Sequence, residues 1–332
     1  MTSALLIRLG GLGDLLAALP AMRLLRAAFP GASLRLLARR EAGRLLREAG
    51  VVDEALDADD PAWKGLFDVN ASAPLPWTAD IILGWFHGRG GFAPHIRAIS
   101  YAWDSNIPLN RFFFERTVEI VRERGRTPAM FEDCRLLFAS PPPPDARSAL
   151  RAKPDARSAG GTGPKGPRGG DELKRAAGAA GSREPRGEPF AVIHPGSGGR
   201  AKRWPLDRFL AVSAALAAEG IGGRIVTGEA EEDLESPLSL ASLPSGWTCV
   251  SRPPLAALAE DLRRAAVYVG NDSGVTHLAA ACGAPTVAIF RDDNLAAWRP
   301  AGPVMILSAA RVEDVPADAV IRAIFDILNG NR

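Results

Sequence analysis

The sequence predicts an α/β protein with two doubly wound, Rossmann-like domains that face each other across a cleft. Three observations lead to this prediction. Short apolar segments with strand-like composition alternate with segments of helical periodicity in both halves of the chain. A low-complexity segment separates the halves, and a length of 332 residues suits two domains better than one.

The first half begins with a strand–helix–strand pattern, in which short Gly- and Pro-containing turns join the segments. Such a pattern favours a parallel sheet with right-handed crossovers. The predicted elements are a strand at 4–9, one helix at 15–29, a strand at 33–38, a helix at 41–49, a strand at 51–56, a strand at 81–83 and a helix at 111–124.

Residues 141–188 differ in kind from the rest of the chain. The segment starts with four prolines, repeats the hexapeptide PDARSA, and contains no aromatic residue, isoleucine or valine. Such a composition buries too little apolar surface to offset the entropy of ordering, so we predict a disordered interdomain linker. Its ten Lys or Arg against six Asp or Glu make a basic interaction segment the alternative.

The second half repeats the doubly wound pattern more clearly. The predicted elements are strands at 190–194, 224–227, 267–270, 286–290 and 304–307, and helices at 206–219, 230–235, 255–264, 274–282 and 317–328. We therefore divide the chain into an N-terminal domain at 1–140, the linker at 141–188 and a C-terminal domain at 189–315. A C-terminal helix at 316–332 can pack back on the N-terminal domain.

Composition excludes several classes of protein. Hydrophobic residues make up 47% and charged residues 23%, as in soluble globular proteins. The net charge of +2 gives no reason to expect a nucleic-acid partner. Cys134, Cys249 and Cys282 lack metal-ligand spacing and are expected to be reduced thiols. Because no apolar run is long enough to span a bilayer, we expect a cytoplasmic protein.

The glycine-rich turn after the first strand is the first candidate site. Gly10, Gly11 and Gly13 allow an anion to approach closely, and the following helix directs backbone N–H groups toward it. The dinucleotide pattern G-x-G-x-x-G fails, because Leu16 stands at its last position, and no P-loop motif occurs. Asp14 is either a helix cap or a carboxylate that takes a proton from an acceptor hydroxyl.

A second candidate turn lies at 194–205, between a strand and the next helix. Its backbone amides and small residues, among them Ser197 and Gly198, suit a diphosphate. Lys202 and Arg203 add direct positive charge. The alternative is a flexible turn with solvated basic side chains, but glycines, a hydroxyl and two cations meet in this one turn.

A third candidate turn lies at 270–277 and again leads from a strand into a helix. Asp272, Ser273 and Gly274 are expected at the helix N-terminus, where they direct amides toward the same cleft. The first two can also be helix caps, and His277 can be a buried histidine with satisfied nitrogens. Three such turns on two doubly wound sheets indicate an anionic ligand between the domains.

Acidic pairs offer a rival site for a metal. Asp57 and Asp59 form a D-x-D pattern, and Asp292 is followed by Asp293. We predict that both pairs lie in solvated loops, because the first is far from the second-half turns and no histidine or cysteine cluster accompanies either. The sequence therefore predicts neither a metal site nor another cofactor.

Together these segments resemble a known family. Residues 6–20 (LIRLGGLGDLLAALP), 194–209 (HPGSGGRAKRWPLDRF) and 270–290 (GNDSGVTHLAAACGAPTVAIF) are similar to glycosyltransferase family 9, the ADP-heptose:lipopolysaccharide heptosyltransferases. The resemblance implies a GT-B fold and an inverting, metal-independent transfer from a nucleotide sugar. It covers both ends of the chain and excludes the linker and much of 57–140.

The same resemblance assigns roles to individual residues. Asp14 matches the family's catalytic base, and Lys202 its diphosphate-binding lysine. Glu232 matches the acid that binds the nucleotide ribose, although a one-residue shift would give this place to Glu231. The resemblance also implies a donor-binding loop at Asp272, Ser273 and Gly274, with His277 beside it. The chemistry of the turns adds an anion loop on the acceptor side at Gly10, Gly11 and Gly13 and donor contacts at Ser197, Gly198 and Arg203.

The resemblance therefore implies an enzyme that moves a sugar, with heptose from ADP-heptose as the first expectation, onto a lipopolysaccharide-core or related glycan. The C-terminal domain would hold the donor and the N-terminal domain the acceptor, in a monomer with at most peripheral contact to the inner membrane.

Two regions depart from the family pattern. Residues 61–138 give no convincing match, and their Trp77, Trp85 and Trp103 can stack on a sugar or pack in a core. Arg291 stands where the family usually has a small, proline-containing turn near the donor, so a different sugar nucleotide stays open. Two other classes remain: a catalytically idle sugar-nucleotide or glycan-binding module, and a nucleotide-sugar epimerase or dehydrogenase, which the missing dinucleotide pattern opposes.

Overall fold

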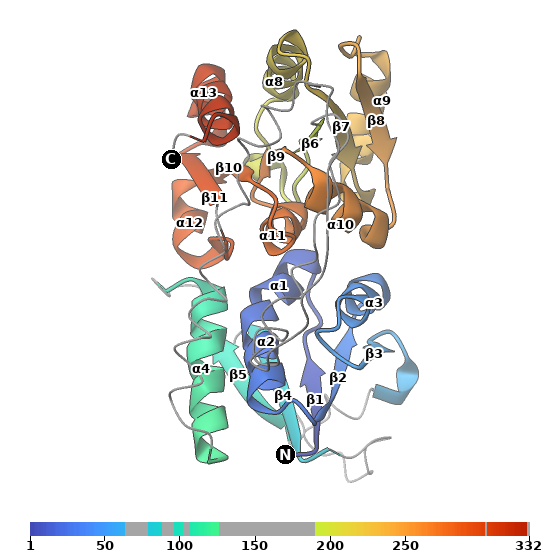
Figure 1. Ribbon diagram of the computed structural model, residues 1–332, viewed down its shortest axis with the longest axis vertical. Helices are drawn as coiled ribbons and strands as arrows, with labels where there is room; N and C mark the ends of the chain where they lie inside the picture. The colour runs from blue at the N-terminus through green and yellow to red at the C-terminus, as the bar shows by residue number, and fades with distance from the viewer. Residues whose placement is uncertain (64–78, 88–95, 102–106, 126–189, 303, 331–332) are drawn as a thin grey trace, which may run out of the picture.

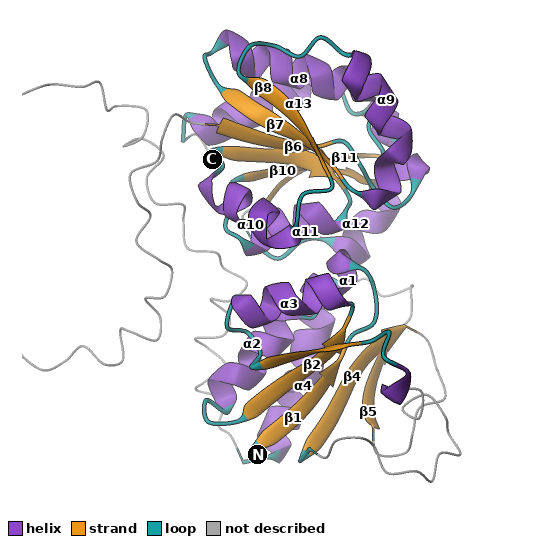
Figure 2. Ribbon diagram, turned by 90° about the vertical axis from the view of Figure 1, so that its right-hand side faces the viewer, coloured by secondary structure: helices purple, strands orange, loops and turns teal. Residues whose placement is uncertain are grey.

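The computed structural model describes residues 1–63, 79–87, 96–101, 107–125, 190–302 and 304–330. These residues form two domains stacked along the long axis of the molecule, each built on one parallel β-sheet (Figure 1, Figure 2). The predicted pair of Rossmann-like domains is confirmed. The predicted linker at 141–188 lies outside the described residues, as do Trp77, Trp103 and much of the range 61–138.

The N-terminal sheet has five parallel strands in the order β3-β2-β1-β4-β5. Its strands are β1 (Ser3–Ile7), β2 (Ser33–Ala38), β3 (Glu54–Asp57), β4 (Ile81–His87) and β5 (Ile96–Tyr101). Its helices are α1 (Leu12–Ala17), α2 (Leu19–Ala28), α3 (Arg40–Glu48) and α4 (Leu109–Glu123). Leu6 on β1 faces the core shared with these helices, whereas Leu5 and Ile7 face the opposite side of the sheet.

The helix predicted to run from 15 to 29 is two helices. α1 ends at Ala17 and α2 begins at Leu19, with Pro20 in its first turn. Proline has no backbone N–H, and its ring clashes with the carbonyl four residues earlier, here that of Leu16, so it kinks or breaks a helix at this point. α1 is therefore a separate short helix, and it lies directly against the C-terminal domain (Figure 2).

The C-terminal sheet has six parallel strands in the order β11-β10-β9-β6-β7-β8. Its strands are β6 (Phe190–His194), β7 (Gly222–Thr227), β8 (Trp247–Ser251), β9 (Val267–Asn271), β10 (Thr286–Arg291) and β11 (Val304–Ala309). Its helices are α8 (Leu206–Ala218), α9 (Glu232–Leu240), α10 (Leu255–Arg264), α11 (Gly274–Ala281), α12 (Asp292–Trp298) and α13 (Ala317–Leu328). Single-turn 3₁₀ helices are η2 (Arg200–Lys202), η3 (Glu229–Glu231) and η4 (Val312–Asp314).

β6 and β9 are neighbours at the centre of this sheet, where the strand order reverses. In open α/β sheets, ligands bind beyond the carboxyl ends of the strands at such a reversal. The two candidate turns of the C-terminal domain follow these two strands, so the topology alone brings them together.

The sequence pattern predicts neither the edge strands β5 and β8 nor the helix α12. An edge strand pairs on one side only, and in β8 only Trp247 is buried, so the apolar signal of a strand is weak. α12 occupies the segment predicted as a solvated acidic loop. Asp292 and Asp293 stand in its first turn, where the helix dipole favours acidic side chains.

α13 packs within its own domain. Its buried face, which includes Val320, Ile324 and Ile327, shares a core with Phe209 of α8. The sequence allows this helix to pack back on the N-terminal domain, but the structure places it on the C-terminal sheet. The physical reason is that α8 and the sheet already present an apolar surface on which the apolar side of the helix is buried.

The two domains touch directly through α1 and α11. A Cβ atom built on Gly13 would lie 3.3 Å from the Cα of Gly274, and one built on Gly274 would lie 2.9 Å from the backbone nitrogen of Gly13. Residues without a side chain are needed for this approach. Nearby, the Asn110 amide of α4 donates to the carbonyl of Arg299, just after α12, at 3.0 Å. These contacts set the carboxyl ends of the two sheets face to face.

Candidate active site

The glycine-rich turn after β1 makes Asp14 the third residue of α1. Its Oδ2 accepts a hydrogen bond from the Gly11 N–H at 3.0 Å, which is the helix-cap arrangement that the sequence allows. Gly10 has to lack a side chain, because a Cβ there would lie 2.4 Å from the Cβ of Asp14. This hydrogen bond leaves the carboxylate able to accept others, because an ionised carboxylate has about four acceptor sites. The Asp14 side chain stays 33% exposed and can still meet a substrate.

Arg8 is a site residue that the sequence analysis missed. It is 4% exposed, and its guanidinium holds Asp14 twice: Nη2 lies 2.8 Å from Oδ1, and Nε donates to the Asp14 carbonyl at 3.0 Å. Nη1 donates to the Trp85 carbonyl at 2.7 Å, and the Phe113 ring centroid lies 5.3 Å from the guanidinium carbon. Trp85 itself is fully buried, so core packing is the role it has. The sequence does place a charged residue directly after a buried strand, and a buried charge requires a partner.

The two turns of the C-terminal domain are joined by hydrogen bonds. Asn271, the last residue of β9, donates from Nδ2 to the Pro195 carbonyl at 2.8 Å and accepts from the Trp204 N–H at 3.0 Å. Ser273 caps α11, and its Oγ accepts from the Thr276 N–H at 3.4 Å. The turns therefore form one surface at the carboxyl ends of β6 and β9.

Lys202 and Asp272 form an ion pair at the centre of this surface. The Lys202 Nζ lies 2.8 Å from the Asp272 Oδ2, and the two side chains are 33% and 6% exposed. The Ser197 hydroxyl donates to the Asp272 carbonyl at 2.7 Å, and the Asn294 amide donates to the same Oδ2 at 2.8 Å. The Lys202 side chain is partly exposed, but its ammonium can bind a phosphate oxygen only by sharing or leaving the Asp272 carboxylate.

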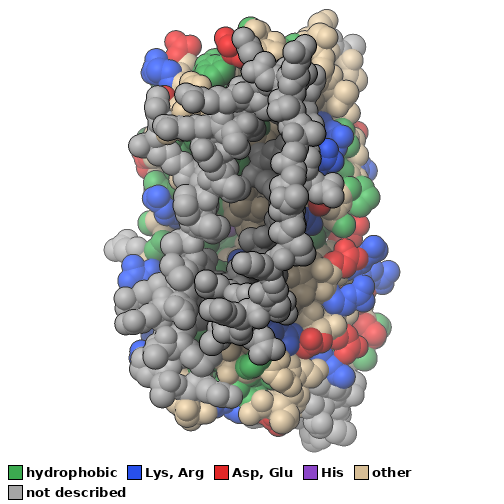
Figure 3. Space-filling model, in the orientation of Figure 1, with side chains coloured by type: hydrophobic (Ala, Val, Ile, Leu, Met, Phe, Trp, Pro, Cys, Tyr) green, Lys and Arg blue, Asp and Glu red, His purple; other side chains and the backbone are tan. Residues whose placement is uncertain are grey.

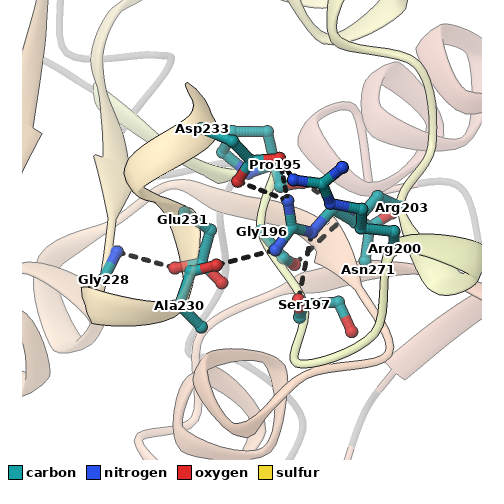
Figure 4. A network of polar contacts seen from close by, with 10 residues as sticks. All are labelled: Pro195, Gly196, Ser197, Arg200, Arg203, Gly228, Ala230, Glu231, Asp233 and Asn271. Carbon is teal, nitrogen blue, oxygen red and sulfur yellow. Dashed lines mark hydrogen bonds and ion pairs between the residues drawn. The ribbon is translucent and has the colours of Figure 1, made fainter. Parts of the chain in front are cut away.

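Arg203 connects the turn after β6 to η3 (Figure 4). Its Nε donates to the Ser197 carbonyl at 3.0 Å, and its Nη2 donates to the Ala230 carbonyl at 2.8 Å. Its Nη1 donates to both oxygens of Asp233, at 2.8 and 2.9 Å, and this hydrogen bonding lowers the pKa of the Asp233 carboxyl. The Arg203 guanidinium thus already donates hydrogen bonds to other groups of the protein, whereas Gly198 in the same turn is exposed. A donor contact of either residue stays a prediction.

Two neighbouring acids compete for the predicted ribose contact. Glu231 is buried, its Oε2 accepts from the Gly228 N–H at 2.7 Å, and a Cβ built on Gly196 would lie 2.3 Å from its carboxyl carbon (Figure 4). Glu232 has a side chain that is 72% exposed and pairs with the Arg252 guanidinium at 2.8 Å. Glu231, the residue reached by a one-residue shift, therefore lies against the turn after β6.

His277 lies buried where the domains meet. Among the residues that the structure describes, its Nε2 has no hydrogen-bond partner. Its Cδ2 would lie 3.5 Å from a Cβ on Gly13, and its ring meets that of Trp298 edge-on with centroids 6.4 Å apart. Burial lowers the pKa of His277 to about 4, although the carboxylates of Asp272 and Asp14 favour its charged form. The imidazole is therefore neutral at neutral pH.

We expect this buried histidine to make stability depend on pH. Its pKa is 6.5 in the unfolded chain and about 4 in the folded one, so its stability contribution is fully present above the unfolded pKa. The contribution falls as the pH drops from there toward the folded pKa, because only the unfolded chain takes up the proton. Between about pH 7.5 and about pH 5, the protein should lose about 2 kcal/mol more unfolding free energy than a His277→Gln variant. Urea unfolding of both proteins measures the difference, and equal losses would contradict the expectation.

One member of each acidic pair that offered a rival metal site forms an ion pair with an arginine. Asp57 pairs with Arg40 at 2.6 Å, and the Asp59 N–H together with this arginine lowers the pKa of the Asp57 carboxyl. Asp293 pairs with Arg291 at 2.6 Å. Figure 3 shows acidic and basic side chains intermixed along the edge that carries α3. Within the described ranges, no three His, Cys, Asp or Glu side chains group closely enough to hold a metal ion.

Comparison with known proteins decides the family. The family model of glycosyltransferase family 9 (heptosyltransferase) matches residues 94–316, which is more than half of the chain. The chain belongs to glycosyltransferase family 9. The resemblance carried by three short segments is thereby confirmed, and the family 9 protein is a glycosyltransferase with the two-domain GT-B architecture. The matched range includes Lys202 and the 270–277 turn and leaves out the turn at Asp14.

Solved structures of similar proteins share the fold over nearly the whole chain. A family 9 glycosyltransferase from Veillonella parvula is 16% identical with a TM-score of 0.66, covering 99% of this chain and 98% of that one. The ADP-heptose lipopolysaccharide heptosyltransferase II of E. coli is 17% identical, with a TM-score of 0.66 and 99% coverage of both chains. E. coli heptosyltransferase WaaC with ADP is 15% identical, with a TM-score of 0.64, covering 98% of this chain and 100% of that one.

One further comparison and one feature of the structure complete the description. No curated protein matches the sequence. In the part of the chain that the structure describes, no helix is both long and apolar enough to cross a membrane. Family membership implies a nucleotide-sugar donor and a glycan acceptor.

Proposed function

We propose that this family 9 enzyme transfers a sugar onto a lipopolysaccharide-core or related glycan, with inversion and without a metal ion. The first candidate for the donor is ADP-heptose, a choice supported by the names of the E. coli relatives. One observation carries the proposal. The contact of α1 with α11 sets Gly13, the residue before Asp14, against Gly274, two residues after Asp272, and Asp272 pairs with Lys202. At this contact burial lowers the pKa of His277, and the charges of Asp272, Asp14 and Lys202 also act on it.

The C-terminal turns supply the groups that a sugar diphosphate needs. The first N–H groups of α11 have no acceptor within the helix, and together with the helix dipole they favour an anion. The Lys202 ammonium, paired with Asp272 just before α11, adds a positive charge. As the bond between the sugar and the diphosphate breaks, negative charge builds on the leaving diphosphate, and these fixed donors stabilise it where it develops.

Asp14 serves as the base on the acceptor side. The acceptor oxygen attacks the anomeric carbon from the side opposite the diphosphate, and its proton passes to the Asp14 carboxylate. The anomeric carbon–oxygen bond breaks, and its electron pair leaves with the nucleoside diphosphate, so the configuration inverts. Arg8 and the Gly11 N–H fix the carboxylate in one orientation for this transfer.

We assign ribose recognition to Glu231 rather than to Glu232. Glu231 lies against Gly196 in the turn that also leads to Lys202, whereas Glu232 points to the solvent and to Arg252. One carboxylate oxygen of Glu231 is held by the Gly228 N–H, which leaves the other to accept from a ribose hydroxyl.

A donor and acceptor panel tests the proposed function. Purified protein is mixed with ADP-, GDP- and UDP-sugars and with lipopolysaccharide-core and shorter glycan acceptors, and release of the nucleoside diphosphate is followed. We expect release that requires an acceptor and is strongest with ADP-heptose. Binding of a sugar nucleotide without turnover on any acceptor would favour the idle binding module instead, and a tightly bound nicotinamide nucleotide would contradict both readings.

A further inference from the structure

Asn294 lies in α12, outside the three turns that the family resemblance covers, yet its amide reaches the donor side of the site. Its Nδ2 donates to the Asp272 Oδ2 at 2.8 Å, and the Lys202 ammonium lies at the same distance from the same oxygen. Asp272 is 6% exposed, so its charge depends on these donors more than on water. One buried carboxylate oxygen is therefore shared by a cation and a neutral amide.

We infer that Asn294 is a positioning residue that keeps Lys202 available to the diphosphate, an inference that rests on the proposed function. A diphosphate and Asp272 compete for one ammonium. Without the amide, the buried carboxylate would draw its compensation from Lys202 alone, because leaving a buried charge unpaired is costly. With the amide in place, Asp272 keeps a hydrogen bond when Lys202 turns toward a phosphate oxygen.

The anchoring of α12 supports this role. Near its far end the ring of Trp298 meets that of His277, and the carbonyl of Arg299 accepts from Asn110 of the other domain. The helix is thus held against both domains, so Asn294 has a fixed place from which to meet the carboxylate. A fixed neutral donor lowers the cost of releasing the ammonium without adding a charge that would itself bind the diphosphate.

Titration calorimetry with ADP tests the inference. Asn294→Leu keeps the side-chain size and removes the donor, and it should weaken ADP binding about tenfold. Asp293→Asn is the matched control, because the neighbouring Asp293 side chain is 60% exposed and pairs with Arg291 rather than with the site. The control should bind ADP like the unchanged protein. Thermal unfolding of each variant establishes that it is folded.

Repeating Asn294→Leu in an Asp272→Asn variant shows whether the loss of ADP affinity depends on competition for Lys202. Asp272→Asn removes the competing charge, and its own ADP affinity is the reference for this background. Adding Asn294→Leu to it should then alter the affinity by less than about twofold. This pair leaves no buried carboxylate uncompensated, so the double variant should fold.

The outcomes separate the inference from the proposed function. Unchanged ADP affinity in Asn294→Leu, or the same tenfold loss in both backgrounds, would overturn the inference and leave the proposed function standing. If the unchanged protein binds none of ADP, GDP, UDP and pyrophosphate, both fall.

Discussion

Replacing Asp14 with asparagine is expected to lower the turnover number of sugar transfer by about 10²- to 10⁴-fold while the protein stays folded. Asparagine has nearly the same shape and can still accept one of the hydrogen bonds that Arg8 and Gly11 donate, but it cannot take up the proton of the acceptor. Donor affinity should change little, because the diphosphate is held by the other domain. Steady-state release of the nucleoside diphosphate gives kcat and KM separately.

Asp53→Asn is the matched control for this experiment. Asp53 accepts from the Arg26 guanidinium at 2.8 Å and from the Leu34 N–H at 2.7 Å, so it combines the same two kinds of donor in the same domain without any part in the site. Both variants should lose a similar amount of stability, and only Asp14→Asn should lose turnover. Similar turnover in the two variants would show that Asp14 acts as a helix cap and not as a base.

The location of the site could be predicted because it depends on local sequence. Glycines after an apolar run and before a helical pattern mark a strand-to-helix turn, whatever the rest of the chain does. The turns at 10–14, 194–205 and 270–277 all have this pattern, and the parallel sheets bring their ends to facing edges. The roles of single residues inside those turns came from the family resemblance instead.

The contacts that complete the site could not be predicted, because they join distant segments. Arg8 is held by the carbonyl of Trp85, which is 77 residues away. Asn294 meets Asp272 only because α12 forms, and the sequence pattern there indicates a loop. The choice between adjacent glutamates was open for a similar reason: a single-turn helix such as η3 has no apolar periodicity from which a buried face can be read.

Gly13 and Gly274 acquire a second role in the structure. The sequence explains both by the approach of an anion to backbone amides. In the folded protein the same two positions let the backbones of the two domains touch, so the turns that bind the ligand also set the distance between the domains. The chemistry of the site and the geometry of the domain contact therefore depend on the same residues, which leaves little freedom to change either alone.

Replacing Lys202 with methionine is expected to lower kcat/KM for the donor by about 10²- to 10³-fold, the range found when one donor to a developing negative charge is removed. Unlike the loss of Asp14, this change should raise the donor KM as well as lower kcat, because the ammonium meets the diphosphate both before and during bond breaking. The variant should stay folded, since Asp272 keeps its hydrogen bond from Asn294.

Arg200→Met controls for the loss of a cation from the same single-turn helix. The Arg200 side chain is 82% exposed and lies 3.4 Å from Asp233, so its removal should leave transfer nearly unchanged. Donor binding by the unchanged protein should weaken as sodium chloride is added, and the dependence should be smaller in Lys202→Met than in Arg200→Met, because only the first change removes a charge that touches the diphosphate. Equal salt dependence and equal kcat/KM in the two variants would mean that the leaving group is stabilised by backbone amides alone.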